Sequence, residues 1–175
     1  MTKILFICLG NICRSPMAEF VMRDMVEKAG LSDRFWIESA ATSDEELGNP
    51  VYPPVRRLLA QHGIDCTGKT ARRLERADWE RFDLLIGMDE GNLRNMRRIL
   101  HAPETPRNAA VPRGSNGSDP NSSAPDCTQK LHLLLDFTDH PRSVADPWYT
   151  RDFEATWRDV NDGCRGLLQA LLSGR

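Results

Sequence analysis

The chain has 175 residues, which is enough for one sizeable hydrophobic core and short for two domains. Hydrophobic residues make up 40% and charged residues 27%, and the net charge is −2, so the composition carries no signature of a nucleic-acid or membrane partner. No stretch approaches the ~20 apolar residues of a membrane span, and no secretory pattern opens the chain. We expect one cytoplasmic domain over residues 1–175, as a monomer or a weak dimer.

Short apolar runs alternate with amphipathic stretches along the chain. The runs predict buried strands, and apolar residues at helical spacing predict helices between them. The first helix is expected to have Ser15 as its N-cap and Pro16 in its first turn, and to end at Gly30. The predicted strands are 3–7, 35–39, 84–88 and 131–137, and the predicted helices are 17–29, 54–62, 89–100 and 153–171. This alternation is typical of β-α-β units in a doubly wound parallel sheet, where ligands bind beyond the carboxyl ends of the strands.

The last predicted helix has the clearest pattern, an apolar stripe in steps of three and four that includes Cys164. Cys164 is therefore expected to be a buried core residue. Residues 101–129 differ from the rest, because they contain five of the eleven prolines, many Gly, Ser and Asn, and no apolar period. We expect this segment to be a long flexible surface loop.

Five cysteines and four histidines are spread along the chain. An odd cysteine count without a secretory pattern favours free thiols in a reducing compartment. There is no Cys-x-x-Cys pair, so we expect no metal site and no cofactor. Cys66 and Cys127 are expected in polar surroundings.

The octapeptide Cys8–Ser15 lies where the first strand ends and the first helix begins. Loop amides and the first amides of a helix point into one small cup there, which favours an anion. Gly10 lets the backbone turn and approach a ligand, and Asn11 tolerates a left-handed conformation. The loop lacks the Gly-Lys-Ser/Thr pattern of a nucleotide-binding loop.

The side chains of this loop predict phosphate chemistry. Cys8 at the floor of the cup is expected to ionise readily, because a helix N-terminus and a nearby arginine favour a thiolate. Ser15 can donate a hydrogen bond to the sulfur, and the planar fork of Arg14 matches two phosphate oxygens. The result would be a nucleophile that needs no separate base.

A phosphate ester also needs an acid for its leaving group, and Asp146 is the candidate. It precedes Pro147, which holds its backbone extended, and two aromatic residues follow, Trp148 and Tyr149. Those rings can flank an aromatic substrate. Asp146 is therefore predicted to be the general acid.

Four motifs resemble the low-molecular-weight protein tyrosine phosphatases, over most of the chain except roughly residues 101–129. They are CLGNICRSPMAE (residues 8–19), SAATSD (39–44), GMDEGNL (87–93) and DPWY (146–149). The resemblance implies a Rossmann-like α/β fold of the phosphotyrosine phosphatase I type, a four-stranded parallel sheet with helices on both faces. It also implies hydrolysis of phosphotyrosine or small aryl phosphates through a cysteinyl-phosphate.

The resemblance assigns roles to individual residues. Cys8 would be the nucleophile, Arg14 would hold the phosphoryl oxygens, and Asp146 would act as acid and then as base. Cys13 would be the neighbour that forms a reversible disulfide with Cys8, and Asp89 a structural acidic residue. The implied substrate-binding residues are Leu9, Gly10, Asn11, Ile12, Cys13, Ser15, Trp148 and Tyr149.

Three features depart from the family pattern. Glu45 and Glu46 stand where the family often has an aromatic wall residue. Lys69 replaces a family histidine near a buried network around Ser39. The segment 101–129 is longer than usual.

Three other functions remain open. Arsenate reductases on the same fold need two further cysteines close together, and the later cysteines here are far apart. Protein arginine phosphatases tend to carry Thr where this chain has Ile12. A non-enzymatic phosphopeptide-binding module would be expected to lose Cys8 or Asp146, and both are present.

Overall fold

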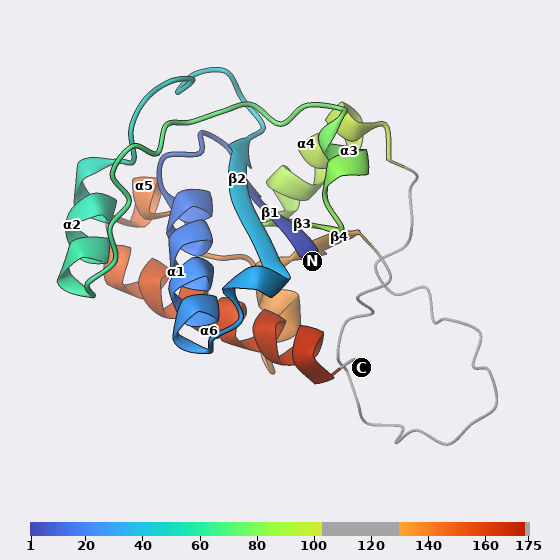
Figure 1. Cartoon of the computed structure of the whole chain (residues 1–175). Helices are drawn as coiled ribbons and strands as arrows, with labels where there is room; N and C mark the ends of the chain where they lie inside the picture. Colours follow the sequence, from blue (N-terminus) through green and yellow to red (C-terminus); the bar gives the residue numbers. More distant parts are fainter. Residues whose placement is uncertain (103–129, 174–175) are drawn as a thin grey trace.

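The fold is organised around a four-stranded parallel sheet with the strand order β2-β1-β3-β4, in a computed structural model that describes residues 1–102 and 130–173 (Figure 1). The register pairs Ile4 with Ile37 on one side of β1 and with Leu84 on the other. The strands are β1 (Thr2–Cys8), β2 (Phe35–Ala41), β3 (Leu84–Gly87) and β4 (Leu131–Leu133).

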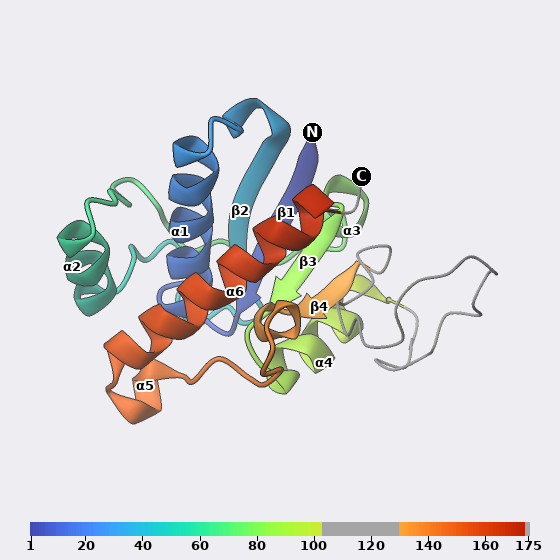
Figure 2. The ribbon, with the colours of Figure 1, turned by 90° about the horizontal axis from the view of Figure 1, so that it is seen from below.

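Helices cover both faces of the sheet, which confirms the predicted doubly wound architecture. Figure 2 shows α1 and α6 crossing one face, and α3 and α4 lying against the other. The helices are α1 (Arg14–Lys28), α2 (Pro53–Gln61), α3 (Asp78–Arg81), α4 (Glu90–Leu100), α5 (Pro147–Thr150) and α6 (Phe153–Ser173), with single turns η1 (Ser32–Arg34) and η2 (Leu134–Phe137).

Two hydrophobic clusters follow from the alternation of side chains along the strands. Ile4 and Phe6 of β1 belong to the larger cluster, with α1, α2 and α6. Leu5 and Ile7 point to the other face and pack with residues of α4. All four of these side chains are fully buried, so β1 is the centre of the core.

The sequence placed the start of the first helix too late. Cys13 is the N-cap of α1, and Ser15 lies inside the first turn. The Ser15 hydroxyl is directed at Cys8 and Asn11 instead of capping the helix. The expected end is confirmed, because Gly30 follows the C-cap with φ +68°.

The prediction of a strand over 131–137 was wrong in its second half. The strand β4 ends at Leu133, and the next four residues form η2. A short apolar run does not distinguish strand from helix. Here the Asp136 carboxylate accepts a hydrogen bond from the Leu133 amide at 2.9 Å and stabilises the turn. The sequence also missed η1, α3 and α5, each of which is only three or four residues long.

Two predictions about cysteines have different outcomes. Cys164 is fully buried in α6, as its apolar stripe predicted. Cys66 was expected in polar surroundings but is 6% exposed and packs in the larger hydrophobic cluster. Cys127 and nearly all of the predicted loop 101–129 lie outside the described residues; at its start, His101 ends α4 in a left-handed conformation.

The sheet topology determines where a ligand can bind. The chain leaves β1 towards β2 on one side and later returns to β3 on the other, so β1 and β3 flank a switch point. Cys8 is the last residue of β1, and Asp89 follows β3 by two residues. Among the residues that the structure describes, no helix has the length and apolar character needed to cross a membrane.

Candidate active site

The loop between β1 and α1 wraps around the sulfur of Cys8. The Asn11 amide donates to Cys8 Sγ at 3.3 Å, and Ser15 Oγ lies 3.0 Å from the same sulfur. Asn11 has φ +56°, the left-handed conformation that asparagine tolerates best among residues with a side chain. This backbone reversal points the loop amide inward, as the sequence predicted.

The Asn11 side chain fixes the orientation of the Ser15 hydroxyl. Asn11 Oδ1 accepts from the Arg72 amide at 3.1 Å, so its Nδ2 donates to Ser15 Oγ at 2.9 Å and to Ser39 Oγ at 2.7 Å. Ser15 Oγ therefore accepts a hydrogen bond from Asn11 and keeps its own proton, for which Cys8 Sγ at 3.0 Å is a nearer acceptor than the Ala40 carbonyl at 3.5 Å. The buried amide thereby leaves the serine hydroxyl free to donate toward Cys8.

Arg14 is buried and joined to two carboxylates. Its Nη1 donates to Asp89 Oδ2 at 2.6 Å and its Nη2 to Asp146 Oδ2 at 2.7 Å. Burial alone would lower the pKa of Arg14, but the charge of Cys8 and the hydrogen bond to Asp89 raise it above its usual value. The guanidinium is therefore permanently charged beside the sulfur.

Cys13 lies in the same loop and is also buried. Burial is the largest cause and the charge of Cys8 the second that together raise the pKa of Cys13 to about 12. Cys13 is thus a neutral thiol at physiological pH. The loop separates two cysteines, of which only Cys8 has donors aimed at its sulfur.

A hollow of about 200 Å³ opens above Cys8 and Arg14. The residues that line it are Cys8, Leu9, Gly10, Ile12, Cys13, Arg14, Glu45, Glu46, Asp146, Trp148 and Tyr149. Trp148 and Tyr149 are 48% and 81% exposed and form one side of the rim. The Trp148 ring packs against Tyr52 with centroids 5.5 Å apart, and the Tyr52 amide donates to the Ile12 carbonyl.

Nearly all the residues expected in the site therefore line one cavity. Asn11 and Ser15 are the two exceptions, because their side chains are bonded to one another and, through Asn11, to Ser39, and do not line the cavity. Glu45 and Glu46 do face the cavity, as their place in the sequence suggested. The family resemblance had placed Asp89 near the cup as a structural acidic residue, and the structure adds the partner that it had not named, Arg14.

A buried polar network supports the loop from behind. Glu19 is 2% exposed and accepts hydrogen bonds from Ser39 Oγ at 2.5 Å and from Lys69 Nζ at 2.8 Å. Lys69 also donates to the Ser39 carbonyl, and Arg23 pairs with the second carboxylate oxygen of Glu19. Lys69, which replaces a family histidine, thus takes part in the buried network around Ser39. The sequence alone had left this role of Lys69 open.

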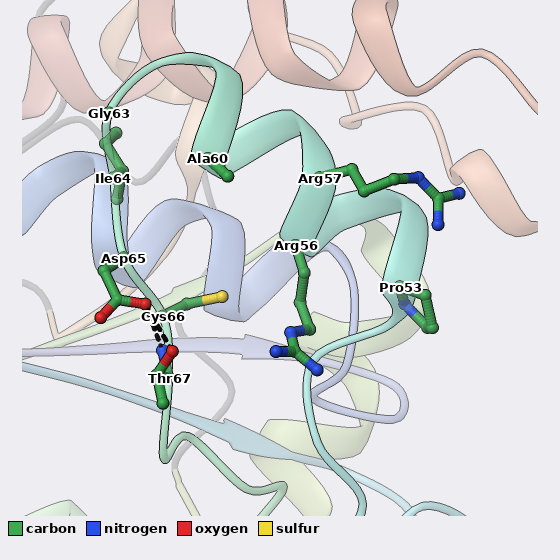
Figure 3. A pocket seen from close by; sticks show the side chains of 9 residues that line it. All are labelled: Pro53, Arg56, Arg57, Ala60, Gly63, Ile64, Asp65, Cys66 and Thr67. Carbon is green, nitrogen blue, oxygen red and sulfur yellow. Dashed lines mark hydrogen bonds between the residues drawn. The ribbon is translucent and has the colours of Figure 1, made fainter.

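A larger hollow, of about 610 Å³, lies beside α2 (Figure 3). None of the residues that line it belongs to the loop around Cys8. Arg56, Asp65 and Thr67 line it, and the Asp65 carboxylate is occupied by the Thr67 amide and hydroxyl. Burial raises the pKa of Cys66 at its edge, so this thiol is a weak nucleophile. The smaller cavity, which is lined by Cys8 and Arg14, is therefore the candidate active site.

In the part of the chain described, no three His, Cys, Asp or Glu side chains are grouped to hold a metal ion.

The fold and this cavity together define a small α/β protein with a cysteine and a buried arginine lining one cavity at the carboxyl end of its first strand. The family model "Low molecular weight phosphotyrosine protein phosphatase" matches residues 3–109. The low molecular weight protein-tyrosine-phosphatase YfkJ of Bacillus subtilis is 31% identical over 173 residues, 98% of this chain and 96% of that protein. The chain therefore belongs to the low molecular weight phosphotyrosine protein phosphatase family, whose members are phosphatases that act on phosphorylated substrates.

Solved structures agree with this assignment. The crystal structure of YfkJ superposes with a TM-score of 0.82, covering 100% of this chain and 97% of that one. SP-PTP, a low molecular weight protein tyrosine phosphatase from Streptococcus pyogenes, is 36% identical with a TM-score of 0.75 and coverages of 99% and 95%. The drosophila arginine phosphatase is 25% identical with a TM-score of 0.79 and coverages of 99% and 100%.

Proposed function

We propose that the chain hydrolyses phosphotyrosine and other aryl phosphate monoesters through a phosphoenzyme on Cys8. The observation that carries this proposal is the sulfur of Cys8, enclosed by the Asn11 amide and the Ser15 hydroxyl. Donors aimed at a sulfur at the start of a helix stabilise a thiolate. The guanidinium of Arg14 is near enough to bind the phosphoryl group that this thiolate attacks.

The reaction takes place in two displacements. Cys8 attacks phosphorus, a sulfur–phosphorus bond forms, and the bond to the aryl oxygen breaks while Asp146 donates a proton to it. Asp146 then removes a proton from water, which attacks phosphorus and breaks the bond to sulfur. Arg14 and the loop amides stabilise the charge on the equatorial oxygens in both steps. Asp89 keeps its contact with Arg14 while the phosphoryl oxygens compete with Asp146 for the other nitrogen.

The rim favours an aryl group over an aliphatic one. Trp148 and Tyr149 present exposed rings beside the cavity, and Tyr52 supports the first of them. Rings of this kind hold an aromatic substrate by stacking and by apolar contact. Glu45 and Glu46, which also line the cavity, disfavour a peptide that carries acidic residues next to its phosphotyrosine.

Trapping the intermediate tests this function. Wild type quenched in acid during turnover of 4-nitrophenyl phosphate should carry one phosphoryl group on the peptide that contains Cys8, detected by mass spectrometry. Cys8→Ser should lose turnover by at least about 10³-fold and still bind phosphate. Cys66→Ala, which removes a thiol outside the cavity, should keep near-normal activity. Turnover by Cys8→Ser near the wild-type rate would contradict the proposal.

Comparing phosphorylated amino acids separates the alternatives. We expect hydrolysis of phosphotyrosine to exceed that of phosphoserine and phosphoarginine at equal enzyme concentration. Faster hydrolysis of phosphoarginine would indicate an arginine phosphatase. Thioredoxin-dependent reduction of arsenate would indicate a reductase, and phosphopeptide binding without turnover would indicate a binding module.

Peroxide should inactivate the enzyme reversibly if Cys8 and Cys13, both free and buried here, form a disulfide.

A further inference from the structure

The segment that brings Asp146 to the cavity is held by α6 at two points. Thr156 Oγ1, fully buried, lies 3.2 Å from the Ala145 carbonyl and 3.3 Å from the Asp152 carbonyl of its own helix, and its one proton is shared between these two acceptors. Arg142 donates through both terminal nitrogens to the two carboxylate oxygens of Asp159, at 2.7 and 2.5 Å. Asp159 is 8% exposed whereas the Arg142 side chain is 55% exposed, so a buried carboxylate of the helix anchors an arginine that lies at the surface.

The same segment is also bound on the side of the sheet. The Val144 amide donates to the Met88 carbonyl at 2.8 Å, just after β3. The Val144 carbonyl accepts from Arg14 Nη1 at 3.4 Å. Residues 142–145 are thereby bound between α6 and the end of the sheet, immediately before the candidate acid.

The geometry of the Arg142–Asp159 pair differs from that of an ordinary surface ion pair. An exposed single contact contributes little and tolerates many side-chain positions. A two-pronged arginine–carboxylate contact fixes the direction and the distance of both partners. Here one partner is almost buried on a long helix, and the other lies four residues before Asp146.

We propose that Arg142 and Asp159 are positioning residues that set the Asp146 carboxyl relative to the sulfur of Cys8. This inference rests on the proposed function, since it assumes that Asp146 protonates the leaving group. Proton transfer depends steeply on donor–acceptor distance, so a shift of about 1 Å in the segment lowers the rate with poor leaving groups most.

The test compares kcat/KM for phenyl phosphate, a poor leaving group, with that for 4-nitrophenyl phosphate, a good one. The double variant Arg142→Gln/Asp159→Asn removes both charges and leaves no buried charge unpaired. We expect ~10-fold loss with phenyl phosphate and no more than ~3-fold loss with 4-nitrophenyl phosphate. Arg142→Lys, which keeps one charged contact but not the fork, should fall between wild type and the double variant.

Two further variants serve as the positive and the negative control. Asp146→Ala should show the largest difference between the substrates. Arg165→Gln breaks an exposed pair with Asp162 on the same helix and should change neither rate. All assays are made well below each variant's Tm, so that loss of folded protein is not counted as loss of rate.

The outcomes separate the two proposals. Equal losses with both substrates in the double variant, or none, would overturn the positioning role while leaving the proposed function intact if Asp146→Ala is selective. If Asp146→Ala itself lowers both rates equally, the acid assignment fails and the positioning role fails with it. If wild type hydrolyses neither ester, the proposed function is wrong.

Discussion

Arg14 is one buried side chain that connects three distant parts of the chain. It starts α1 beside Cys8, and its guanidinium binds Asp89 and Asp146, which lie 75 and 132 positions away. These carboxylates balance its charge in a site where an isolated guanidinium would be costly to bury. Its two terminal nitrogens therefore lie at the floor of the cavity in a fixed plane.

Glu45 is the rim residue whose replacement should change substrate binding most directly. It lines the cavity together with Trp148 and Tyr149 but carries a charge. Glu45→Trp should lower KM for aryl phosphates ~3- to 10-fold, because a ring pair contributes about 1 kcal/mol. Glu45→Gln measures removal of the charge alone and should account for the smaller part of the gain. Unchanged KM in both variants would mean that this position does not contact the substrate.

The two glycines of α6 explain how η2 can pack so closely on that helix. A Cβ built on Gly163 would lie 2.5 Å from the Leu134 side chain, and one on Gly166 would lie 2.0 Å from the Phe137 carbonyl oxygen. Glycine inside a helix is ordinarily unfavourable by about 1 kcal/mol relative to alanine. Here the absence of a side chain lets η2 approach the helix closely, with a side chain at Gly163 and with its backbone at Gly166.

Gly166→Ala should therefore destabilise the protein although alanine favours helices. We expect the free energy of unfolding to fall by ~2–3 kcal/mol, as for an overpacked core, measured by urea denaturation. Gly163→Ala should lose less, because the Leu134 side chain can move whereas the Phe137 backbone cannot. Increased stability in Gly166→Ala would show that η2 does not approach α6 so closely.

The network around Glu19 joins four separate parts of the molecule. Glu19 and Arg23 come from α1, Ser39 from β2 and Lys69 from the loop after α2, and Asn11 connects the group to the loop around Cys8. Charges this deeply buried are tolerated only when they are paired and hydrogen-bonded. The loop around Cys8 is thus supported by residues that never reach the cavity.

Lys69→Met should break this network. Removing one partner of a buried pair lowers stability by about 3–5 kcal/mol, and here Arg23 remains, so we expect ~2–3 kcal/mol in chemical denaturation. The matched control is Lys28→Met, which breaks an exposed pair with Asp24 and should cost less than about 1 kcal/mol. Equal effects of the two substitutions would mean that the buried network contributes no more than a surface pair.

Stability should also decrease in alkaline solution. Below pH 9 the Cys13 thiol is protonated in both the folded and the unfolded protein. Above pH 9 this thiol ionises in the unfolded chain but stays protonated in the folded protein, where its pKa is about 12. The unfolded state is then favoured by about 1.4 kcal/mol for each pH unit between 9 and 12. Burial raises the pKa of Cys164 as well and adds to the same decline.

Cys13→Ala isolates this contribution. The slope of unfolding free energy against pH above 9 should become less steep by about 1.4 kcal/mol per unit, whatever the change in stability at pH 7. Cys8→Ser serves as the comparison at the other loop cysteine. An unchanged slope in Cys13→Ala would show that this thiol titrates similarly in the folded and unfolded states.

Some features of this protein were determined by its sequence alone, because they depend on neighbouring residues. The octapeptide 8–15 contains a strand end, a loop and a helix start, so its cup could be derived without knowing the rest of the fold. The apolar stripe of α6 and the alternation of strands and helices could also be predicted from neighbouring residues, because buried positions repeat with the period of each element. The short elements α3 and α5 carry too few residues to show such a period.

Only the tertiary structure decided which distant side chains meet. The sheet order places β3 beside β1, and this brings Asp89 to Arg14. The packing of α6 brings Asp159 to Arg142 and places the turn 134–137 close against Gly163 and Gly166. The contact between Lys69 and Glu19 has the same origin. Such contacts depend on how whole elements pack, and no spacing along the chain encodes them.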